Sequence, residues 1–121
     1  MKTSRDIGFE KEREVVTYLK KLKYKILDTN FKTQFGEIDI VAKQYRTIVF
    51  IEVKYRKSSF RGTPQESVTD RKQKKIIKSA IVYLKEKNIK NNVRFDVASV
   101  SDNCIEIINS AFSISDGMYY L

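Results

Sequence analysis

The sequence predicts an α/β fold in which a mixed sheet is flanked by helices. Apolar residues recur at helical spacing in residues 6–23 and again in a stretch that ends near residue 87. Between these helices, residues 24–31 and 36–56 carry the apolar runs and alternation typical of strands, and residues 93–100 and 104–109 add two more. The resulting order, α-β-β-β-α-β-β, is typical of the α/β class.

The length and charge of the chain bound what it can be. Its 121 residues predict a single domain, 1–121, that is large enough for a real core. A net charge of +9 favours a polyanionic partner, with nucleic acid first and an anionic membrane second. The simpler alternative is a basic soluble protein whose charge has no specific partner.

Histidine is absent and cysteine occurs only once, which limits the chemistry available to the chain. The chain has no histidine, which excludes Ser-His-Asp triads, Cys-His pairs and histidine-metal nucleases. Its one cysteine, Cys104, is expected to be an ordinary strand residue. The first residues lack an apolar leader, and no apolar run approaches membrane-spanning length, so we expect a cytoplasmic protein without a membrane partner.

The first predicted helix carries an acid on its apolar face. The face consists of Val15, Val16, Leu19 and Leu22. Glu12 precedes Val15 and Val16 by three and four positions, so it shares their side of the helix. One interpretation is a favourable position near the positive end of the helix dipole. The other is that the helix packs on the sheet and directs Glu12 at Asp39.

Residues 36–56 predict a β-hairpin, because two apolar runs flank the short polar connection 43–47. Strand side chains alternate between faces. On the first strand the alternation groups Glu37, Asp39 and Val41 against Ile38, Ile40 and Ala42. On the second it groups Ile48, Phe50, Glu52, Lys54 and Arg56 against Val49, Ile51, Val53 and Tyr55. One face is therefore core and the other mixes apolar with charged residues.

The mixed face suggests a metal site. Antiparallel pairing can place Asp39 beside Glu52, and two such carboxylates are costly to bury without partners. They suit a hard divalent cation, which prefers oxygen ligands, while Lys54 can contact a phosphate. The alternative is a solvent-facing row of charges. Ile48 and Phe50 argue against it, because they lie on the same face.

These residues resemble a known nuclease pattern. An Asp followed on the next strand by Glu-X-Lys is the site pattern of the PD-(D/E)XK nuclease superfamily. The segments Gly36–Ala42 and Val49–Arg56 resemble the YraN-like family of predicted endonucleases, which is similar to archaeal Holliday-junction resolvases. The spacing of Gly8, Glu12, Tyr18 and Leu19 also matches that family, whereas Lys11 stands where the family usually has a second glycine.

The resemblance implies a restriction-endonuclease-like core and metal-dependent hydrolysis of DNA. Asp39 and Glu52 would hold Mg²⁺ or Mn²⁺, with the Val53 carbonyl as a further oxygen. Lys54 would position the attacking water or stabilise the transition state, and Glu12 would complete the metal shell or orient a water. No role follows for Glu37. The expected substrate is branched, or at least non-sequence-specific, DNA, and symmetric cutting of two strands would favour a homodimer.

The second predicted helix is strongly basic. Thr63-Pro64-Gln65-Glu66 has the form of a capping box, so the helix starts there or near Thr69. Its expected buried face is Ile76, Ile77, Ala80, Ile81 and Leu84, and Gln73 is expected to point inward. We assign phosphate contacts to Arg56, Lys57, Arg61, Arg71, Lys72, Lys74, Lys75 and Lys78. Simple solvation of a charged helix face is the alternative.

Two other functions remain open from the sequence. The chain can be a nucleic-acid-binding module without catalysis, in which acidic residues only balance a basic surface. It can also be a subunit of a DNA repair or uptake complex. Dependence on a divalent cation separates a nuclease from both. Asp96 in the strand 93–100 is expected to be structural, because no partner carboxylate is close in sequence.

Overall fold

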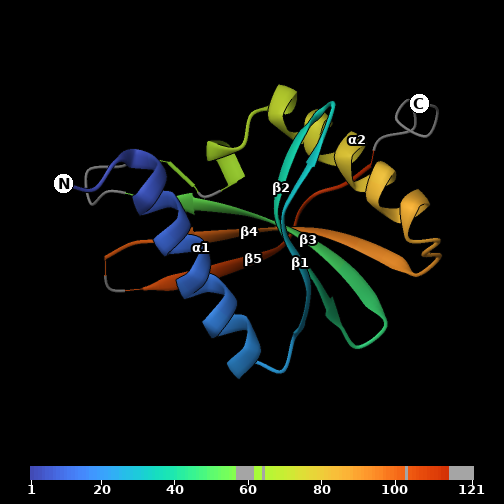
Figure 1. Cartoon of the computed structure of the whole chain (residues 1–121), viewed down its shortest axis with the longest axis horizontal. Coiled ribbons are helices and arrows are strands. Elements are labelled where there is room, and N and C mark those ends of the chain that lie inside the picture. Colours follow the sequence, from blue (N-terminus) through green and yellow to red (C-terminus); the bar gives the residue numbers. More distant parts are fainter. Residues whose placement is uncertain (57–61, 64, 103, 115–121) are drawn as a thin grey trace.

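The computed structural model describes residues 1–56, 62–63, 65–102 and 104–114, and it has the predicted order of elements (Figure 1). The helices and strands are α1 (Ser4–Lys21), β1 (Lys25–Thr33), β2 (Gly36–Gln44), β3 (Thr47–Tyr55), α2 (Asp70–Glu86), β4 (Asn92–Val100) and β5 (Ile105–Phe112). A short 3-10 helix, η1 (Gln65–Ser67), precedes α2. Cys104 was expected within the last strand, but it precedes β5 and is an exposed free thiol.

The sheet is mixed, as predicted. Its five strands lie in the order β1-β2-β3-β4-β5, and every neighbouring pair is antiparallel except β3 and β4, which are parallel. A parallel pair needs a long crossover connection, and α2 lies within it. The predicted hairpin of β2 and β3 is confirmed, with Gln44 opposite Thr47 and Ile40 opposite Ile51.

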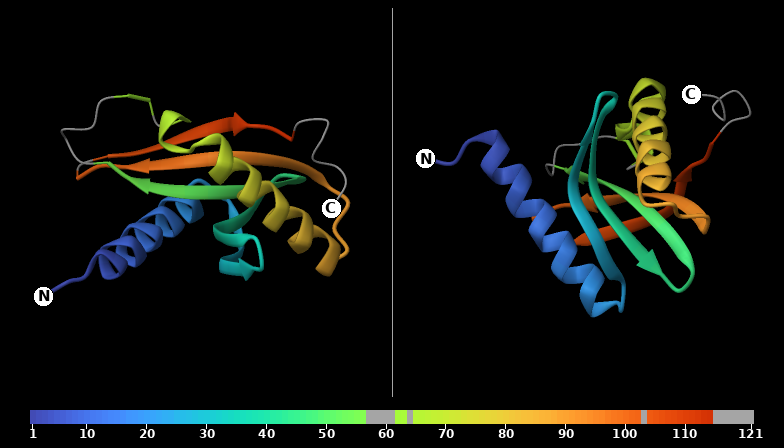
Figure 2. Two further views of the ribbon diagram at one scale, coloured as in Figure 1. Left: turned by 90° about the horizontal axis from the view of Figure 1, so that it is seen from above. Right: turned by 45° about the vertical axis from the view of Figure 1, so that its right-hand side comes forward.

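Each helix covers its own hydrophobic cluster, so the fold has two cores separated by the sheet (Figure 2). The α1 side contains Val15, Leu19, Tyr24, Ile40, Ala42, Val49, Ile51, Ala98 and Val100. The α2 side contains Ile38, Val41, Ile48, Phe50, Val68, Ile76, Ile77, Ala80, Tyr83, Phe95 and Val97. The alternation predicted for β3 is therefore correct. In the described part of the chain, neither helix has the length and apolar composition needed to cross a membrane.

Threonine caps explain where the helices begin. Thr3 and Asp6 form a reciprocal capping box at α1, and the Thr69 hydroxyl accepts a hydrogen bond from the Lys72 amide at α2. The predicted box of Thr63 and Glu66 also forms, with hydrogen bonds of 3.1 and 3.2 Å, but it starts η1 rather than α2. Leu22 was expected to be buried; it is instead the C-cap of α1 and is 49% exposed.

The pleat of β2 is interrupted beside Asp39, and this corrects the predicted faces of that strand. Ile38 lies in the α2-side core with Val41, whereas Ile40 lies in the α1-side core. Strict alternation would have put Ile38 and Ile40 together. The regular ladder with β3 begins only at Ile40, and the neighbouring residue of β1, Asn30, has a φ of 52°. This local irregularity turns the start of β2 away from β3.

Both edge strands of the sheet are irregular. The pairing of β1 with β2 shifts register between Ile26 and Asp28, and the pairing of β4 with β5 shifts between Phe95 and Val97. Ser110 in β5 also has a positive φ, of 53°. Bulges and left-handed residues bend a strand and disrupt its row of backbone hydrogen bonds.

Asp96 is structural, as predicted. Its fully buried carboxylate accepts hydrogen bonds at 2.9 Å from the Arg94 side chain and from the Ser110 amide. Arg94 also donates to Gln44 at 2.8 Å, so the network joins β4 to β5 and to the end of β2. Hydrogen bonding to Asp96, and then the negative charge of Asp96, raises the pKa of Arg94.

Replacing Asp96 should destabilise the fold strongly. Asp96→Ala leaves the Arg94 guanidinium without its buried partner, and breaking a buried pair costs about 3–5 kcal/mol. We expect about 3 kcal/mol, because the Arg94 side chain is 22% exposed and water partly compensates it. Urea unfolding measures the loss, and Asp102→Ala serves as the exposed control. A change below about 1 kcal/mol would contradict the structural role.

Candidate functional site

Asp39 lies where β2 and β3 separate. One carboxylate oxygen, Oδ2, accepts a 2.8 Å hydrogen bond from the backbone amide of Val53. Extending the register from the Ile40–Ile51 pair places Asp39 opposite Glu52. The two side chains also interact through a hydrogen bond, which confirms the predicted proximity of these acids, and Asp39 is fixed to β3 through its side chain.

Glu52 is an almost fully buried acid, with 5% of its surface exposed. Its Oε1 atom lies 3.6 Å from the Lys54 ammonium and 3.8 Å from the Lys72 ammonium. Burial, followed by the negative charge of Asp39, raises the pKa of Glu52 to about 7, although both lysines oppose the rise. Glu52 is consequently only partly ionised near neutral pH.

Burial also raises the pKa of Asp39, against the lowering effects of the Val53 amide and of Lys72. Asp39 and Glu52 thus lie together, and ionising both acids at once is energetically unfavourable. Their carboxylate oxygens are suitable ligands for a hard divalent cation. The positive charge of the cation would favour the ionised form of both acids.

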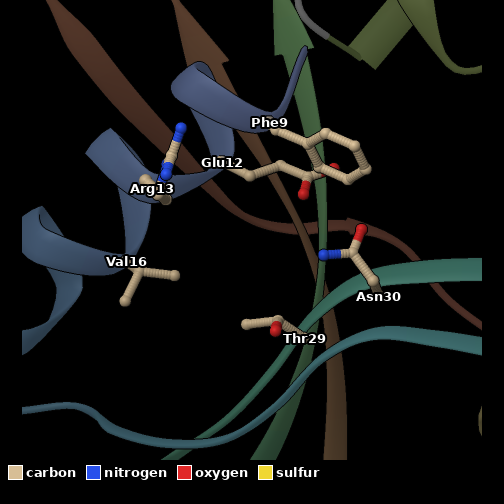
Figure 3. Close-up of a pocket in the computed structure, with 6 residues that line it drawn as sticks. All are labelled: Phe9, Glu12, Arg13, Val16, Thr29 and Asn30. Atoms are coloured by element: carbon tan, nitrogen blue, oxygen red, sulfur yellow. The ribbon is translucent and has the colours of Figure 1, made fainter. Parts of the chain in front are cut away.

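Glu12 approaches Asp39 from α1. In Figure 3 its side chain extends from the helix past the Phe9 ring, and Asn30 projects from β1 toward the same space. Burial is the largest cause of a pKa raised to about 7, followed by the negative charge of Asp39, while hydrogen bonding with Asn30 opposes it. Glu12 lines two cavities, of about 290 and 400 Å³, and Glu37 lines the larger one.

Asp39 is the central acid of the three. It interacts with Glu12, which comes from α1, and with Glu52, whose lysine neighbour Lys72 comes from α2. Within the described residues, no three acidic side chains are arranged to hold a metal ion. The Asp39–Glu52 pair is therefore the best candidate for direct metal binding, with Glu12 beside it.

Two α2 residues lie differently from expectation. Lys72 was assigned to phosphate, but its ammonium pairs with Glu52. Its position four residues before the buried Ile76 is a signal for this inward direction. Gln73 was expected near the site, but its amide donates a 3.0 Å hydrogen bond to the Val68 carbonyl. Gln73 therefore anchors the segment that leads into α2.

The other predicted phosphate contacts divide into separate groups. Arg56 donates a hydrogen bond to the Gly62 carbonyl at 2.8 Å. Lys57 and Arg61 lie outside the described residues. The remaining four cations line a cavity of about 420 Å³ next to the β1–β2 turn, namely Arg71, Lys74, Lys75 and Lys78.

Asn30 lies beside Glu12 and was not predicted from the sequence to be near the candidate site. It has a left-handed backbone, it hydrogen-bonds with Glu12, and its Oδ1 atom is buried without a hydrogen-bond partner among the described residues. Asn adopts this conformation more readily than most residues, which is the signal available in the sequence. A polar atom of this kind needs a water or a ligand as its partner.

Comparison with known proteins identifies the family. The profile described as "Uncharacterised protein family UPF0102" matches residues 11–100, which contain Glu12, Asp39, Glu52 and Lys54. The chain belongs to the UPF0102 family. Among its relatives, UPF0102 proteins of Persephonella marina and Clostridium botulinum are each 44% identical, over 88% and 92% of this chain and 93% and 97% of their own. A Thermodesulfovibrio yellowstonii UPF0102 protein is 46% identical, over 88% of this chain and 96% of its own.

The buried acids predict how the stability of this UPF0102 protein depends on pH without metal. The pKa of Glu52 is raised on folding. Its contribution to the free energy of unfolding is therefore fully present below pH 4.5 and is lost as the pH rises through about 7. Between pH 5 and 8 we expect the free energy of unfolding of the wild type to fall by on the order of 2 kcal/mol. Glu52→Gln should abolish this fall. Urea unfolding in EDTA measures both curves.

The matched control for this measurement is Glu10→Gln, an acid on the outer side of α1 that pairs with Lys2 at the surface. It should leave the pH dependence of the wild type unchanged. Parallel curves for the wild type and Glu52→Gln would show that Glu52 does not hold its proton in the folded state.

Proposed function

We propose that this UPF0102 protein is a metal-dependent DNA endonuclease that hydrolyses phosphodiester bonds. The single observation that carries the proposal is the buried Asp39–Glu52 pair at the separation of β2 and β3, with Lys54 and Lys72 next to it. Buried acids with raised pKa values in a cleft are typical of functional sites. A purely structural pair would be expected to find one strong cationic partner, as Asp96 finds Arg94.

The metal ligands in this proposal are Asp39 and Glu52. Mg²⁺ and Mn²⁺ prefer oxygen, and Mg²⁺ retains several waters, so two carboxylates suffice. When bound, the cation would acidify the attacking water and offset the charge of the phosphate. The Val53 amide keeps the Asp39 carboxylate in a fixed orientation at 2.8 Å. This preorganisation avoids a rearrangement at the moment of reaction.

Two lysines from different elements, β3 and α2, flank the acid pair. Lys54 is 31% exposed and lies 3.6 Å from Glu52, so it can reach a phosphate at the surface while staying beside the acids. We assign it to stabilising the negative charge that develops on the phosphate oxygens. Lys72 comes from α2 and contacts the same Glu52 oxygen at 3.8 Å. Its charge lowers the pKa of both Asp39 and Glu52, which favours the metal-binding form.

Glu12 is suited to handling protons. Its pKa of about 7 leaves it partly protonated at neutral pH, where a group can both accept and donate a proton. It faces cavities large enough for water and part of a ligand. We assign Glu12 to orienting a water next to Asp39, because its position on the α1 side places it beside the metal ligands.

The expected substrate is DNA that is recognised without sequence preference. The net charge of +9 favours a polyanion, and the cations on α2 lie on the same side of the sheet as Glu52. Branched DNA is the preferred class. Symmetric cutting of a junction would require two copies of the chain, one for each strand.

A cleavage assay tests the proposal directly. Duplex, flap, single-stranded and four-way-junction DNA are incubated with the protein and Mg²⁺, Mn²⁺ or EDTA. We expect cleavage of at least one substrate with a divalent cation, none with EDTA, and none by Asp39→Asn. Salt-sensitive binding without cleavage in either metal would instead favour a nucleic-acid-binding module or a subunit of a larger complex.

Lys54→Ala should abolish cleavage without abolishing binding. Removing one preorganised contact to the transition state costs about a hundredfold or more in turnover. Affinity for DNA should stay within about tenfold of wild type, because one phosphate contact is a small part of a basic footprint. Single-turnover cleavage and binding in EDTA separate the effects. Lys20→Ala, at the end of α1, is the control, and wild-type turnover in Lys54→Ala would remove this residue from the mechanism.

Asp39→Asn should have opposite effects on stability with and without metal. In EDTA the variant should be as stable as wild type or more so, because one repelling charge is gone. In saturating Mn²⁺ it should be less stable, because wild type gains about 2.7 kcal/mol at a hundredfold excess over Kd. Melting temperatures in the two buffers measure this. An equal loss in both would indicate that Asp39 forms only a structural interaction.

A further inference from the structure

Four cations of α2 form one stripe beside the β1–β2 turn. Arg71, Lys74, Lys75 and Lys78 stand at positions i, i+3, i+4 and i+7, so they share a helix face. Like charges at these spacings repel one another. Within the described part of the chain, none of the four pairs with a carboxylate, in contrast to Lys72. A stripe of unneutralised cations favours an anionic ligand.

An aromatic ring lies in the same cavity. Phe35, at the tip of the β1–β2 hairpin, lines the cavity of about 420 Å³ together with the four cations and Gln34. The Lys78 ammonium lies 5.5 Å from the centroid of the Phe35 ring. The tip of the hairpin lies alongside α2 in Figure 1 and in the right-hand view of Figure 2. The cavity therefore combines one flat apolar surface with several positive charges.

The hairpin tip is held in place against the helix. The Thr33 hydroxyl accepts a 3.0 Å hydrogen bond from the Phe35 amide and contacts the Ser79 hydroxyl of α2 at 2.8 Å. Gly36 has a φ of 150°, which favours glycine, and a Cβ there would stand 3.8 Å from the Lys75 Cβ. These contacts fix the Phe35 backbone relative to the cations, so the hairpin tip loses little conformational entropy when a ligand binds.

We propose that this cavity binds an unpaired nucleotide of DNA, with its base stacked on Phe35 and its phosphates bound by the four cations. The inference rests on the proposed function for the choice of DNA. An aromatic ring with a basic groove is the combination that binds single strands without sequence preference. A base within an intact duplex has both faces covered by its neighbours, so only an unpaired base can stack on the ring.

The existing contact of Lys78 does not block this binding. An exposed cation–π contact is weaker than the stacking of a base on an aromatic side chain. A base can therefore replace the ammonium on the ring, and the freed ammonium is then next to the phosphates of the same nucleotide. Only Lys78 would change its partner, from the Phe35 ring to a phosphate, and its charge would remain paired.

The composition of this surface favours a nucleotide over an anionic membrane. A helix that binds a membrane surface presents a wide apolar face to the lipid. The apolar face of α2 is instead buried in the core, through Ile76, Ile77, Ala80 and Tyr83. The cavity offers one ring, which suits a single base.

The distance between the cavity and the acids indicates which form of DNA would be preferred. Phe35 precedes Asp39 by four residues, or roughly 13 Å along an extended strand. An unpaired nucleotide at Phe35 would thus lie close to the bond at the acid pair without occupying it. The preferred substrate is then DNA with a single-stranded segment next to the cleaved bond, as at a flap or a branch.

Binding without metal tests this inference independently of cleavage. Fluorescence anisotropy in EDTA compares a labelled single strand, an abasic strand of the same length and a blunt duplex. We expect Phe35→Ala to weaken binding of the single strand about tenfold and to change the other two less than twofold. Tyr45→Ala, at the exposed tip of the β2–β3 hairpin, should change none of them. An equal effect of Phe35→Ala on all three ligands would overturn the proposal.

A fluorescent variant keeps the test valid if Phe35→Ala folds poorly. The chain has no tryptophan, so Phe35→Trp introduces a single indole at the site. A stacked base should quench its emission when the single strand binds, whereas the abasic strand should not. Tyr45→Trp provides the matched control at the other hairpin. Absence of quenching at saturation, or quenching by vesicles of anionic lipid instead of DNA, would overturn the proposal.

The cations are tested through salt dependence. Replacing Arg71, Lys74 and Lys78 by Ala should lower the slope of log affinity against log salt for the single strand by about 2, at roughly 0.7 for each contact. Lys85→Ala with Lys90→Ala, toward the far end of α2 and beyond it, should leave the slope nearly unchanged. Equal slopes for the two sets would overturn the assignment. Absence of cleavage would count against the proposed nuclease but not against this binding site.

Discussion

The hydrogen bond from the Val53 amide to the Asp39 carboxylate is the contact on which the candidate site depends. In a regular antiparallel ladder a backbone carbonyl would accept from a buried amide, and an amide left without a partner is costly. Here a side chain takes that place. The two strands can therefore separate beyond Ile40 and Ile51 without leaving the amide unsatisfied. The same contact fixes an acid at the point of separation.

The two faces of the sheet supply different groups to this point. The helix on one face brings Glu12, and the helix on the other brings Lys72. Asp39 can interact with both because its strand changes direction there. Burial by two hydrophobic cores raises the pKa values of these acids, and the lysines only partly offset the effect. A ligand that adds positive charge between the strands would therefore stabilise the ionised form of these acids.

The order of elements and the pairing of Asp39 with Glu52 followed from the sequence, because alternation and a short hairpin turn determine them locally. The direction of Ile38 did not, because alternation assumes a regular strand and the pleat of β2 is interrupted beside Asp39. The contact of Lys72 with Glu52 joins segments twenty residues apart, and only the packing of α2 on the sheet creates it. Periodicity describes one element at a time, whereas the candidate site is made where elements meet.

The irregular edge strands restrict how a second copy of this chain can associate with the first. Extending a sheet across two molecules requires a straight strand with a free row of amides and carbonyls. On β1 that row is disturbed by the register shift after Ile26 and by the left-handed Asn30, and on β5 by the shift opposite Phe95 and by Ser110. If two copies act together, as the proposed cutting of a junction requires, they would meet through side chains rather than through a shared sheet, and their two sheets would remain separate.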